Sequence, residues 1–365
     1  NNLLLQILVN TFPNTNIRFN QLIDEKKNVQ LYLRKNMHLI KKQRDPFILL
    51  ASKMIQSFLP LSFIENYEKI RHEILKNKNL KKKKKIIFTS NLFGKGDKYN
   101  IWIAEKVHQG SKYIVGQHGQ GYLEYYDKFS RVEFRTCDKF ISWGNRKFSK
   151  KIKPLFNFKI WGEEKKIFKN NKKILIITRS SGTQITHYDR WELGNKIFKK
   201  TKILIERIDS SLKKNLVLKL HKNYKKNFYP EFDKFLSRKS DLSIKKDESF
   251  KKLVDQSRLV VFNDYSTGFL ECLSIDHPTL CLFPSKLNFI HPSNKKDFKM
   301  LEKNNLIFFS EIKLASFIND NFRNIELWWN SEKIKKIKKN FCTKYSKKSY
   351  KGFFKNYKKF SIELN

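Results

Sequence analysis

The feature that most constrains the fold is a series of short apolar runs that alternate with segments long enough to form amphipathic helices. The runs IIFTS, YIVGQ and FISWG lie at residues 86–90, 113–117 and 140–144, and ILIIT, LVLKL, LVVFN and TLCLF begin at residues 174, 216, 259 and 279. Apolar runs of this length with helix-length connections predict parallel strands covered on both faces. The sequence therefore predicts an α/β protein with two sheets in series and a cleft between them.

Length and texture suggest how the 365 residues are divided, because domains average roughly 150 residues. We expect a helical region over residues 1–80 that belongs to an N-terminal lobe, with apolar residues at helical spacing at Phe47, Leu50, Met54 and Phe58. An N-terminal α/β lobe over 81–165, a C-terminal α/β lobe over 166–325 and C-terminal helices over 326–365 that pack back on the body complete the prediction.

The charge is strongly basic, with 77 Lys and Arg against 34 Asp and Glu and a net charge of +43. With 40% hydrophobic and 14% aromatic residues, the chain is too apolar for a disordered polycation. Nucleic acid or an anionic membrane surface would be the ordinary partner of such a charge. The lysines are spread along the whole chain together with many Asn, Ile and Phe, so a codon bias toward A and T is a rival explanation.

The four cysteines form no CxxC pair and predict neither a disulfide framework nor a zinc site. No apolar run approaches the roughly 18 residues that a membrane span needs, and the first residues lack the features of a signal peptide. We therefore expect a cytoplasmic protein, with peripheral attachment to the inner face of the cytoplasmic membrane as a further possibility. The start at Asn1, directly within an apolar stretch, suggests that upstream sequence is missing.

Polar residues follow the apolar runs at the positions where ligands bind in parallel sheets, outside the carboxyl ends of the strands. In the C-terminal lobe these residues are Arg179, His221 and Asp264. In the N-terminal lobe the corresponding residue is His118, within the glycine-containing segment GQHGQG. Taken alone, each histidine is better explained as a packed or surface imidazole, but the shared placement favours one functional edge in each lobe.

The segment NDYSTGFLE, at residues 263–271, predicts a strand end followed by a helix start. Ser266 and Thr267 would lie at the helix N-terminus, where free amides and the helix dipole favour a phosphate. Glu271 shares a helix face with Thr267 and would need a partner such as ribose hydroxyls. The alternative is that Ser266 or Asp264 is a helix N-cap and Glu271 points to solvent.

Other local motifs are weaker. RSSGT at 179–183 offers Arg179 and Ser180 to phosphate oxygens, whereas His187 and Asp189 could form an acid/base pair or a loop hydrogen bond. GKG at 94–96 lacks the third glycine of a dinucleotide fingerprint, and no P-loop motif occurs. NAD and P-loop nucleotide binding are therefore disfavoured.

Four segments together carry a resemblance to a known family: GQHGQGY, DKFISWG, KLHKN and NDYSTGFLECLSIDHPTL. Over roughly residues 58–341 the chain resembles a family of bacterial surface-carbohydrate transferases first noted in leptospires. More distantly it is similar to the glycerophosphotransferases that polymerise teichoic acids and to capsule sialyl- and ulosonic-acid transferases. The resemblance implies the GT-B architecture, with two Rossmann-like lobes.

The resemblance also implies residue roles. His118 matches the base of the acceptor-side lobe, His221 the donor-phosphate histidine, and Ser266 with Thr267 the hydroxyl pair at the phosphate-binding helix. Arg179, Ser180, Asp264 and Glu271 complete the expected donor site, and Gly119, Gly121 and Tyr122 the expected acceptor-side loop. This chain departs from the relatives at Lys222, where they often have proline, and at Gln120, where they have glycine.

The function expected from the resemblance is transfer of a sugar or polyol phosphate from an activated nucleotide to a cell-surface polysaccharide or lipid-linked glycan. No metal or other cofactor is expected, and the nucleotide could be a cytidine nucleotide. A basic scaffold that binds nucleic acid or a membrane surface without catalysis is the alternative.

Overall fold

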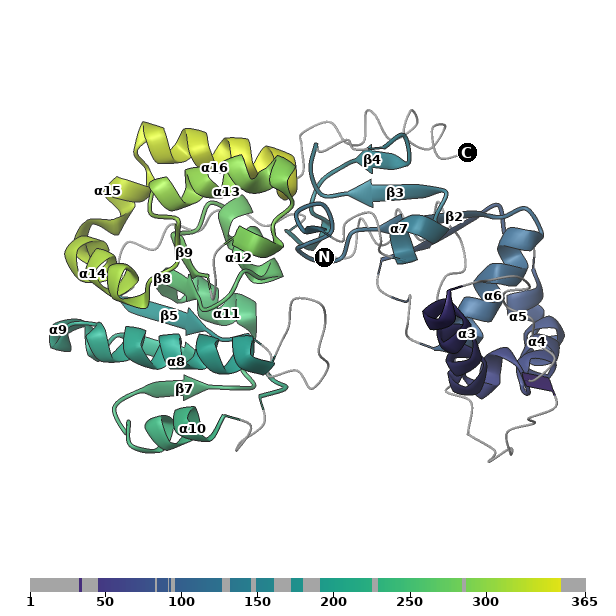
Figure 1. Cartoon of the computed structure of the whole chain (residues 1–365). Helices are drawn as coiled ribbons and strands as arrows, with labels where there is room; N and C mark the ends of the chain where they lie inside the picture. The colour runs from purple at the N-terminus through teal and green to yellow at the C-terminus, as the bar shows by residue number, and fades with distance from the viewer. Residues whose placement is uncertain are drawn as a thin grey trace. The chain divides into compact units, whose positions relative to one another are not determined.

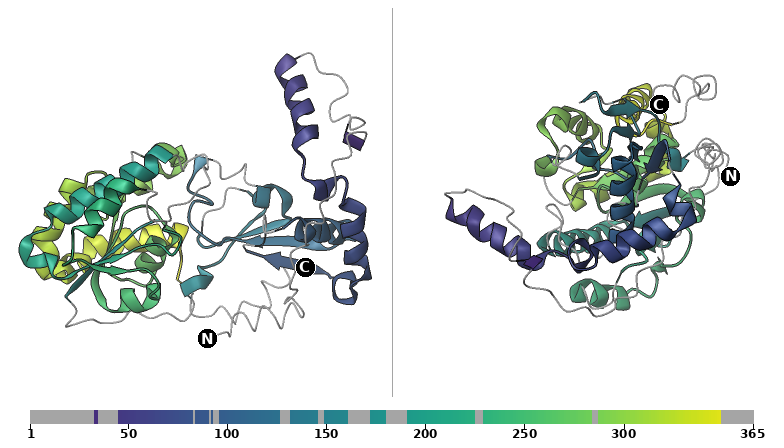
Figure 2. Two further views of the ribbon diagram at one scale, coloured as in Figure 1. Left: turned by 90° about the horizontal axis from the view of Figure 1, so that it is seen from below. Right: turned by 90° about the vertical axis from the view of Figure 1, so that its right-hand side faces the viewer.

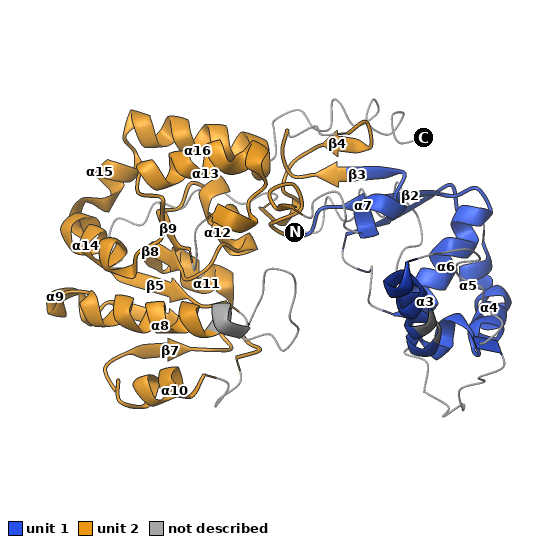
Figure 3. Ribbon diagram, in the orientation of Figure 1, with its two compact units in different colours: residues 1–118, 132–140, 358–365 blue, residues 119–131, 141–357 orange. Residues whose placement is uncertain are grey.

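A computed structural model describes residues 33–34, 45–82, 84–90, 92, 96–126, 132–145, 149–160, 172–179, 191–224, 229–283 and 287–348. The chain forms two compact units (Figure 3). The first comprises residues 1–118, 132–140 and 358–365, and the second comprises residues 119–131 and 141–357. The four sequence ranges that we expected for the lobes stay a prediction.

The first unit combines helices with the start of a sheet. Its helical elements are α3 (Pro46–Phe58), η1 (Leu61–Phe63), α4 (Tyr67–Lys76), α5 (Lys78–Lys81), α6 (Asp97–His108) and α7 (Val132–Thr136). Strands β1 (Ile86–Thr89) and β2 (Lys112–Gly116) pair in parallel, with Ile86 opposite Lys112. The sheet order is β1-β2-β3-β4, where β3 is Lys139–Ser142 and β4 is Ile152–Pro154.

The second unit is built on a six-stranded sheet (Figure 1). Its strands are β5 (Lys173–Ile177), β6 (Leu216–Lys219), β7 (Ser243–Lys245), β8 (Ser257–Phe262), β9 (Thr279–Leu282) and β10 (Ile307–Phe308). Neighbouring strands pair in parallel, in the order β10-β9-β8-β5-β6-β7. When the strands of this sheet are numbered in sequence order, the order is that of a Rossmann sheet, in which the fourth strand lies beside the first.

Helices cover both faces of this sheet. The helical elements are η3 (Phe158–Ile160), α8 (Trp191–Arg207), α9 (Ser210–Lys213), α10 (Pro230–Ser237), α11 (Phe250–Asp255), α12 (Thr267–Ser274), η4 (Leu287–Phe289), α13 (Pro292–Lys303), α14 (Glu311–Asn321), η5 (Phe322–Asn324), α15 (Ile325–Trp329) and α16 (Glu332–Tyr345). Figure 2 shows the helices of this unit stacked on the two sides of the strands.

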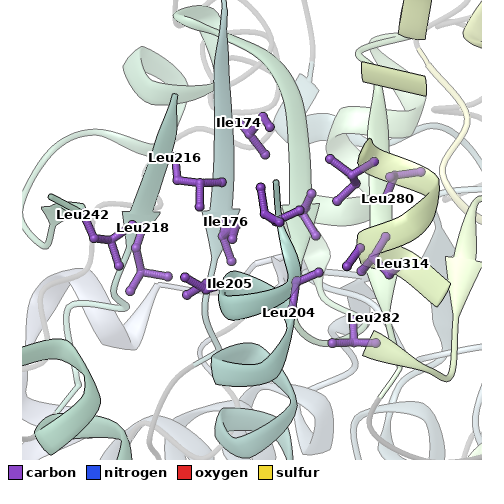
Figure 4. Packing of buried hydrophobic residues seen from close by; sticks show 14 of the residues in the cluster. Ile174, Ile176, Leu204, Ile205, Leu216, Leu218, Leu242, Leu280, Leu282 and Leu314 are labelled. Atoms are coloured by element: carbon purple, nitrogen blue, oxygen red, sulfur yellow. The ribbon is translucent and has the colours of Figure 1, made fainter. Parts of the chain in front are cut away.

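The strand residues divide between two cores because successive side chains of a strand point to opposite faces. Ile174 and Ile176 of β5 pack with α8, α10 and α14 (Figure 4). Leu175, between them, packs with α11, α12, α13 and α16 on the other face. Strands buried on both faces read as continuous apolar runs, which is why the sequence shows ILIIT and LVVFN without alternation.

The aspartate, tryptophan and glycine of the DKFISWG segment have structural roles. The Asp138 carboxylate accepts a hydrogen bond from the Tyr113 amide (2.8 Å), at the start of β2. Gly144 lies against the end of α16, where any Cβ would overlap the Lys344 carbonyl oxygen. The Lys347 amide donates to the Trp143 carbonyl (2.7 Å), which continues this contact.

The prediction of an α/β protein with two sheets is confirmed, and each predicted apolar run contains a strand. The described part of residues 1–80 is helical apart from its turns. Trp329 of α15 and Phe341 of α16 pack in the same core as Leu175. Among the described residues, no helix is long and apolar enough to cross a membrane.

Candidate functional site

The centre of the Rossmann-ordered sheet brings two strand ends together that are far apart in sequence. β5 and β8 are neighbours, with Ile177 opposite Phe262. The chain leaves β5 toward α8 and leaves β8 toward α12, so the two connections diverge from this point. Such a topological switch point is where open parallel sheets bind their ligands, at the carboxyl ends of the strands. Arg179 and Asp264 follow these two strands.

Asn263 fixes the relative position of the chain segments that follow β5 and β8. Its side-chain oxygen accepts from the Arg179 amide (2.9 Å), and its side-chain nitrogen donates to the Thr201 hydroxyl of α8 (3.0 Å). Both Asn263 and Thr201 are buried. A buried amide with satisfied polar atoms rigidifies its surroundings, so Asn263 fixes where the chain turns after β5.

Arg179 and Asp264 form an ion pair at this switch point, with 3.1 Å between guanidinium Nη1 and carboxylate Oδ2. Both side chains are largely buried. The second carboxylate oxygen of Asp264 accepts from the Tyr265 amide (2.8 Å). Asp264 thus orients the guanidinium, whose planar fork suits phosphate oxygens.

His221 lies at the end of the neighbouring strand β6. Its amide donates to the Thr178 hydroxyl (3.2 Å), and its Nδ1 accepts from the Asn223 amide (3.1 Å). Burial, with Lys222 and Lys219 nearby, lowers the pKa of the imidazole below its ordinary value. The neutral ring with an acceptor at Nδ1 carries its proton on Nε2, so His221 is a neutral hydrogen-bond donor.

The start of α12 presents two hydroxyl residues. Ser266 is the N-cap residue, with extended backbone, and its side chain makes no capping hydrogen bond. The Thr267 hydroxyl accepts from the Gln120 amide (3.2 Å), and a Cβ at Gly119 would lie 3.0 Å from the same oxygen. Both residues therefore lie at the start of α12, and the Ser266 side chain does not cap the helix. Their phosphate-binding role stays a prediction.

The segment that follows His118 belongs to the second unit and is held there by hydrogen bonds. The Gln120 side chain donates to the Tyr265 carbonyl (3.1 Å). Gly121 has a φ of +87°, and a Cβ there would lie 2.7 Å from the Tyr125 ring, so the turn requires glycine. Tyr122 is buried. The loop residues expected on the acceptor side, Gly119, Gly121 and Tyr122, therefore belong to the same unit as α12.

The buried carboxylate of Glu124 adds further hydrogen bonds that hold this segment in place. Glu124 is 1% exposed and accepts from the Tyr265 hydroxyl (3.2 Å) and the Leu123 amide (3.0 Å). The Glu124 carbonyl accepts from the His291 amide at the start of α13 (2.9 Å). Burial raises the pKa of the Tyr265 phenol, which therefore stays protonated and donates to Glu124.

Glu271 does not point to solvent. Its side chain is 19% exposed, and its carboxylate lies 3.7 Å from the Lys159 ammonium of η3. Burial raises the pKa of this carboxyl, and Lys159 partly opposes the increase. The partner that a buried carboxylate needs is thus supplied by a lysine of the same unit.

His118 and three other residues singled out in the sequence complete the list. His118 is partly buried and is the last residue of the first unit before Gly119. Ser180, His187 and Asp189 lie outside the described residues. Among the described residues, no group of three or more His, Cys, Asp and Glu side chains could hold a metal ion.

Sequence reasoning missed Asn263 and Gln120 as organising residues. Asn263 directly precedes Asp264 at the end of an apolar run, so its position was a usable signal. Gln120 contacts Thr267 across 147 positions, and no local pattern reports a contact of that range.

The fold is that of an α/β protein with a Rossmann-ordered sheet, which has an ion pair and a helix N-terminus at its switch point. The sequence match goes further. The chain belongs to the LIC12162 family transferases, whose family model matches residues 1–359. It is thus a member of a family of transferases, and the match extends beyond the region that the motifs covered.

Two further comparisons complete the picture. A comparison with curated protein sequences finds no significant match. Among solved structures, the chain is similar to S. aureus MnaA with UDP, at 13% identity and a TM-score of 0.47 with 88% of each chain covered. It is similar to Acinetobacter baumannii MurG, at 11% identity and a TM-score of 0.45, with 82% of this chain and 76% of that chain covered. It is also similar to the wall teichoic acid polymerase TagF, at 12% identity and a TM-score of 0.39, with 70% of this chain and 67% of that chain covered.

Proposed function

We propose that the chain transfers a sugar or polyol phosphate from a nucleotide-activated donor to a cell-surface glycan, with the donor bound at the carboxyl edge of the second sheet. The observation that carries this proposal is the placement of the Arg179–Asp264 pair and the α12 N-terminus at the β5/β8 switch point. The membership in a family of transferases supports the reaction class.

The residues at this edge suit the charge that develops on a departing nucleotide phosphate. Arg179 offers a guanidinium, α12 offers N-terminal amides beside the Ser266 and Thr267 hydroxyls, and His221 offers a neutral Nε2–H. Oriented donors of this kind stabilise developing negative charge without reorganising during the reaction. In this proposal protein groups carry that task and no metal takes part.

The proposed reaction needs a base for the acceptor hydroxyl, and we assign His118 to it. The imidazole takes the hydroxyl proton, the acceptor oxygen bonds to the transferred group, and the bond from that group to the nucleotide phosphate breaks. Histidine is the side chain that most often acts as a general base in enzymes. The anchored segment 119–126 follows His118 directly and limits the freedom of the backbone beside it.

A thermal-shift panel with CMP, CDP, UDP, GDP and ADP tests the donor site. A nucleotide at about 100 times its dissociation constant adds about 2.7 kcal/mol to the stability of the folded state. We expect one base to stand out, at low and at high salt, and a Ser266→Ala, Thr267→Ala variant to lose the shift. Ser249→Ala is the matched control, because Ser249 is an N-cap of α11 that also makes no side-chain capping bond.

Equal shifts with all five nucleotides, erased by salt, would contradict this proposal. That result would favour the alternative of a basic protein that binds polyanions without selectivity, since phosphate attraction alone is independent of the base and falls steeply with salt. If Ser249→Ala also lost the thermal shift by the nucleotide, the loss in the Ser266→Ala, Thr267→Ala variant could not be assigned to nucleotide binding at α12, and the proposal would lose this support.

A further inference from the structure

The amide of the Gln120 side chain has a fixed orientation. Its Nε2 donates to the Tyr265 carbonyl (3.1 Å) and to the Tyr125 hydroxyl (3.3 Å). A backbone carbonyl can only accept a hydrogen bond, so the nitrogen of the Gln120 amide, and not its oxygen, faces Tyr265. The position of Oε1 follows from that of Nε2, because the two atoms belong to one planar group.

The side-chain oxygen of Gln120 has an open acceptor position. In the part of the chain that the structure describes, no hydrogen bond reaches Oε1, and the side chain is only partly buried. The two heteroatoms of an amide are about 2.2 Å apart, so Oε1 lies within about 5.5 Å of the Tyr265 carbonyl oxygen. Tyr265 directly precedes Ser266, the N-cap residue of α12. Oε1 therefore lies beside the start of α12.

The backbone of Gln120 contacts the same helix start. Its amide donates to the Thr267 hydroxyl oxygen (3.2 Å), so this hydroxyl keeps its own proton to donate to a ligand. The proposed phosphate site at α12 thus offers hydroxyl and amide donors. An ionised phosphate offers acceptors only, so an amide oxygen beside it must take its partner from another part of the ligand.

That part is the transferred group. In the proposed function, on which this inference rests, the transferred group lies between the leaving phosphate at α12 and the base His118. Gln120 contacts α12 through Thr267, and it follows His118 by two positions, which keeps the Cα atoms of His118 and Gln120 within about 7 Å of each other. The hydroxyls of a sugar or polyol are donors that suit an amide oxygen.

We propose that Gln120 Oε1 accepts a hydrogen bond from a hydroxyl of the transferred sugar or polyol, which makes Gln120 a specificity-determining residue of the donor site. The amide is already held by Tyr265 and Tyr125, so little conformational freedom is lost when the ligand binds. A site built to bond a hydroxyl discriminates against an analogue that lacks it, because the polar group is then left unpaired. The substrate class that fits is an activated sugar or polyol with a free hydroxyl close to its phosphate.

Equilibrium binding of intact donors and of their nucleotides tests this inference. The probes are UDP-glucose, CMP-N-acetylneuraminate and CDP-glycerol, each compared with UDP, CMP or CDP. We expect Gln120→Leu to bind the intact donor about fivefold more weakly, which corresponds to one neutral hydrogen bond, and to bind the nucleotide as tightly as the wild type does. Gln256→Leu is the matched control, because Gln256 is a partly buried glutamine of the same unit at the other end of β8.

Analogues of the bound donor that lack one hydroxyl each identify the contact. One of them should bind the wild type about fivefold more weakly than the intact donor does. Gln120→Leu should bind that analogue and the intact donor equally, because the two changes remove the same hydrogen bond. Gln120→Gly, which carries the residue of the similar family members, is the second variant and should show the same selective loss if Gln120→Leu does not fold.

Three outcomes would overturn this inference and leave the proposed donor site intact. The first is an unchanged affinity of Gln120→Leu for the intact donor. The second is an equal loss of affinity for donor and nucleotide, which indicates a structural role. The third is that every deoxy analogue loses the same factor with the variant as with the wild type. A wild type that binds none of the nucleotides and donors would contradict the proposed function as well.

Discussion

An imidazole beside a phosphate is often pictured as a cation, but the surroundings of His221 keep it neutral. The Asn223 amide occupies Nδ1, and burial together with Lys219 and Lys222 lowers the pKa of the ring. Protonation would place a second N–H opposite the Asn223 amide. His221 therefore suits the donation of one Nε2–H to an anionic group across the neutral pH range.

The lowered pKa makes a prediction for folding stability. The unfolded chain takes up the proton near pH 6.5, whereas the folded chain takes it up only at lower pH. The folded state therefore loses stability as the pH falls below about 6.5. His221→Asn, whose side-chain oxygen can still accept from the Asn223 amide, should lose less. Urea unfolding at several pH values measures both curves, and parallel curves would contradict the assignment.

Local pattern was enough to predict some of the site residues and not others. Arg179, His221 and Asp264 each follow an apolar run, so strand topology alone brings them to one edge. The contacts of Gln120 with Thr267 and of Glu124 with Tyr265 join segments more than 140 positions apart. Such contacts depend on the packing of the whole unit and leave no periodic trace in the sequence.

Among the elements, α16 shows how a motif that carries a family resemblance can be structural. Its C-terminal end passes directly over Gly144, and the Asn145 amide donates to the Thr343 carbonyl (2.9 Å). The Asn157 side chain donates to the Ser346 hydroxyl (3.0 Å) just beyond the helix. The glycine of the W-G pair is therefore explained by close backbone packing.

Replacing Gly144 by alanine should destabilise the protein. The new methyl group would overlap the Lys344 carbonyl, so the end of α16 must shift. Overpacking of this kind costs about 1–3 kcal/mol in the free energy of unfolding, which chemical denaturation measures. Equal stability of Gly144→Ala and the wild type would show that α16 does not pack on this segment.

The strands that the sequence did not predict are the short ones. β4, β7 and β10 have three, three and two residues. β7 is the sheet edge and carries the sequence SIK, which is largely exposed. A continuous apolar run appears where both faces of a strand are buried, so an exposed edge strand such as β7 escapes detection. β10 is buried, but it is only two residues long.

For the whole molecule, the chain joins a Rossmann-ordered sheet to a second, smaller one and has a net charge of +43. The two sheets were predictable from seven apolar runs. The contacts of the segment after β2 were not predictable, because residues 119–126 follow β2 in sequence and yet contact α12 and α13 through Gln120 and Leu123. A short loop is assigned by its contacts, which sequence texture does not reveal.

The central claim is that the second unit binds an activated nucleotide donor and that His118 acts as the base in the transfer reaction. The most direct measurement is nucleotide release from a panel of CMP-, CDP- and UDP-activated sugars and polyols, with water standing in for the acceptor hydroxyl. The account predicts release from one donor class by the wild type. It predicts a loss of about 10²–10⁴-fold in kcat for His118→Ala, with the thermal shift by the matching nucleotide unchanged. Release by His118→Ala at the wild-type rate would contradict it.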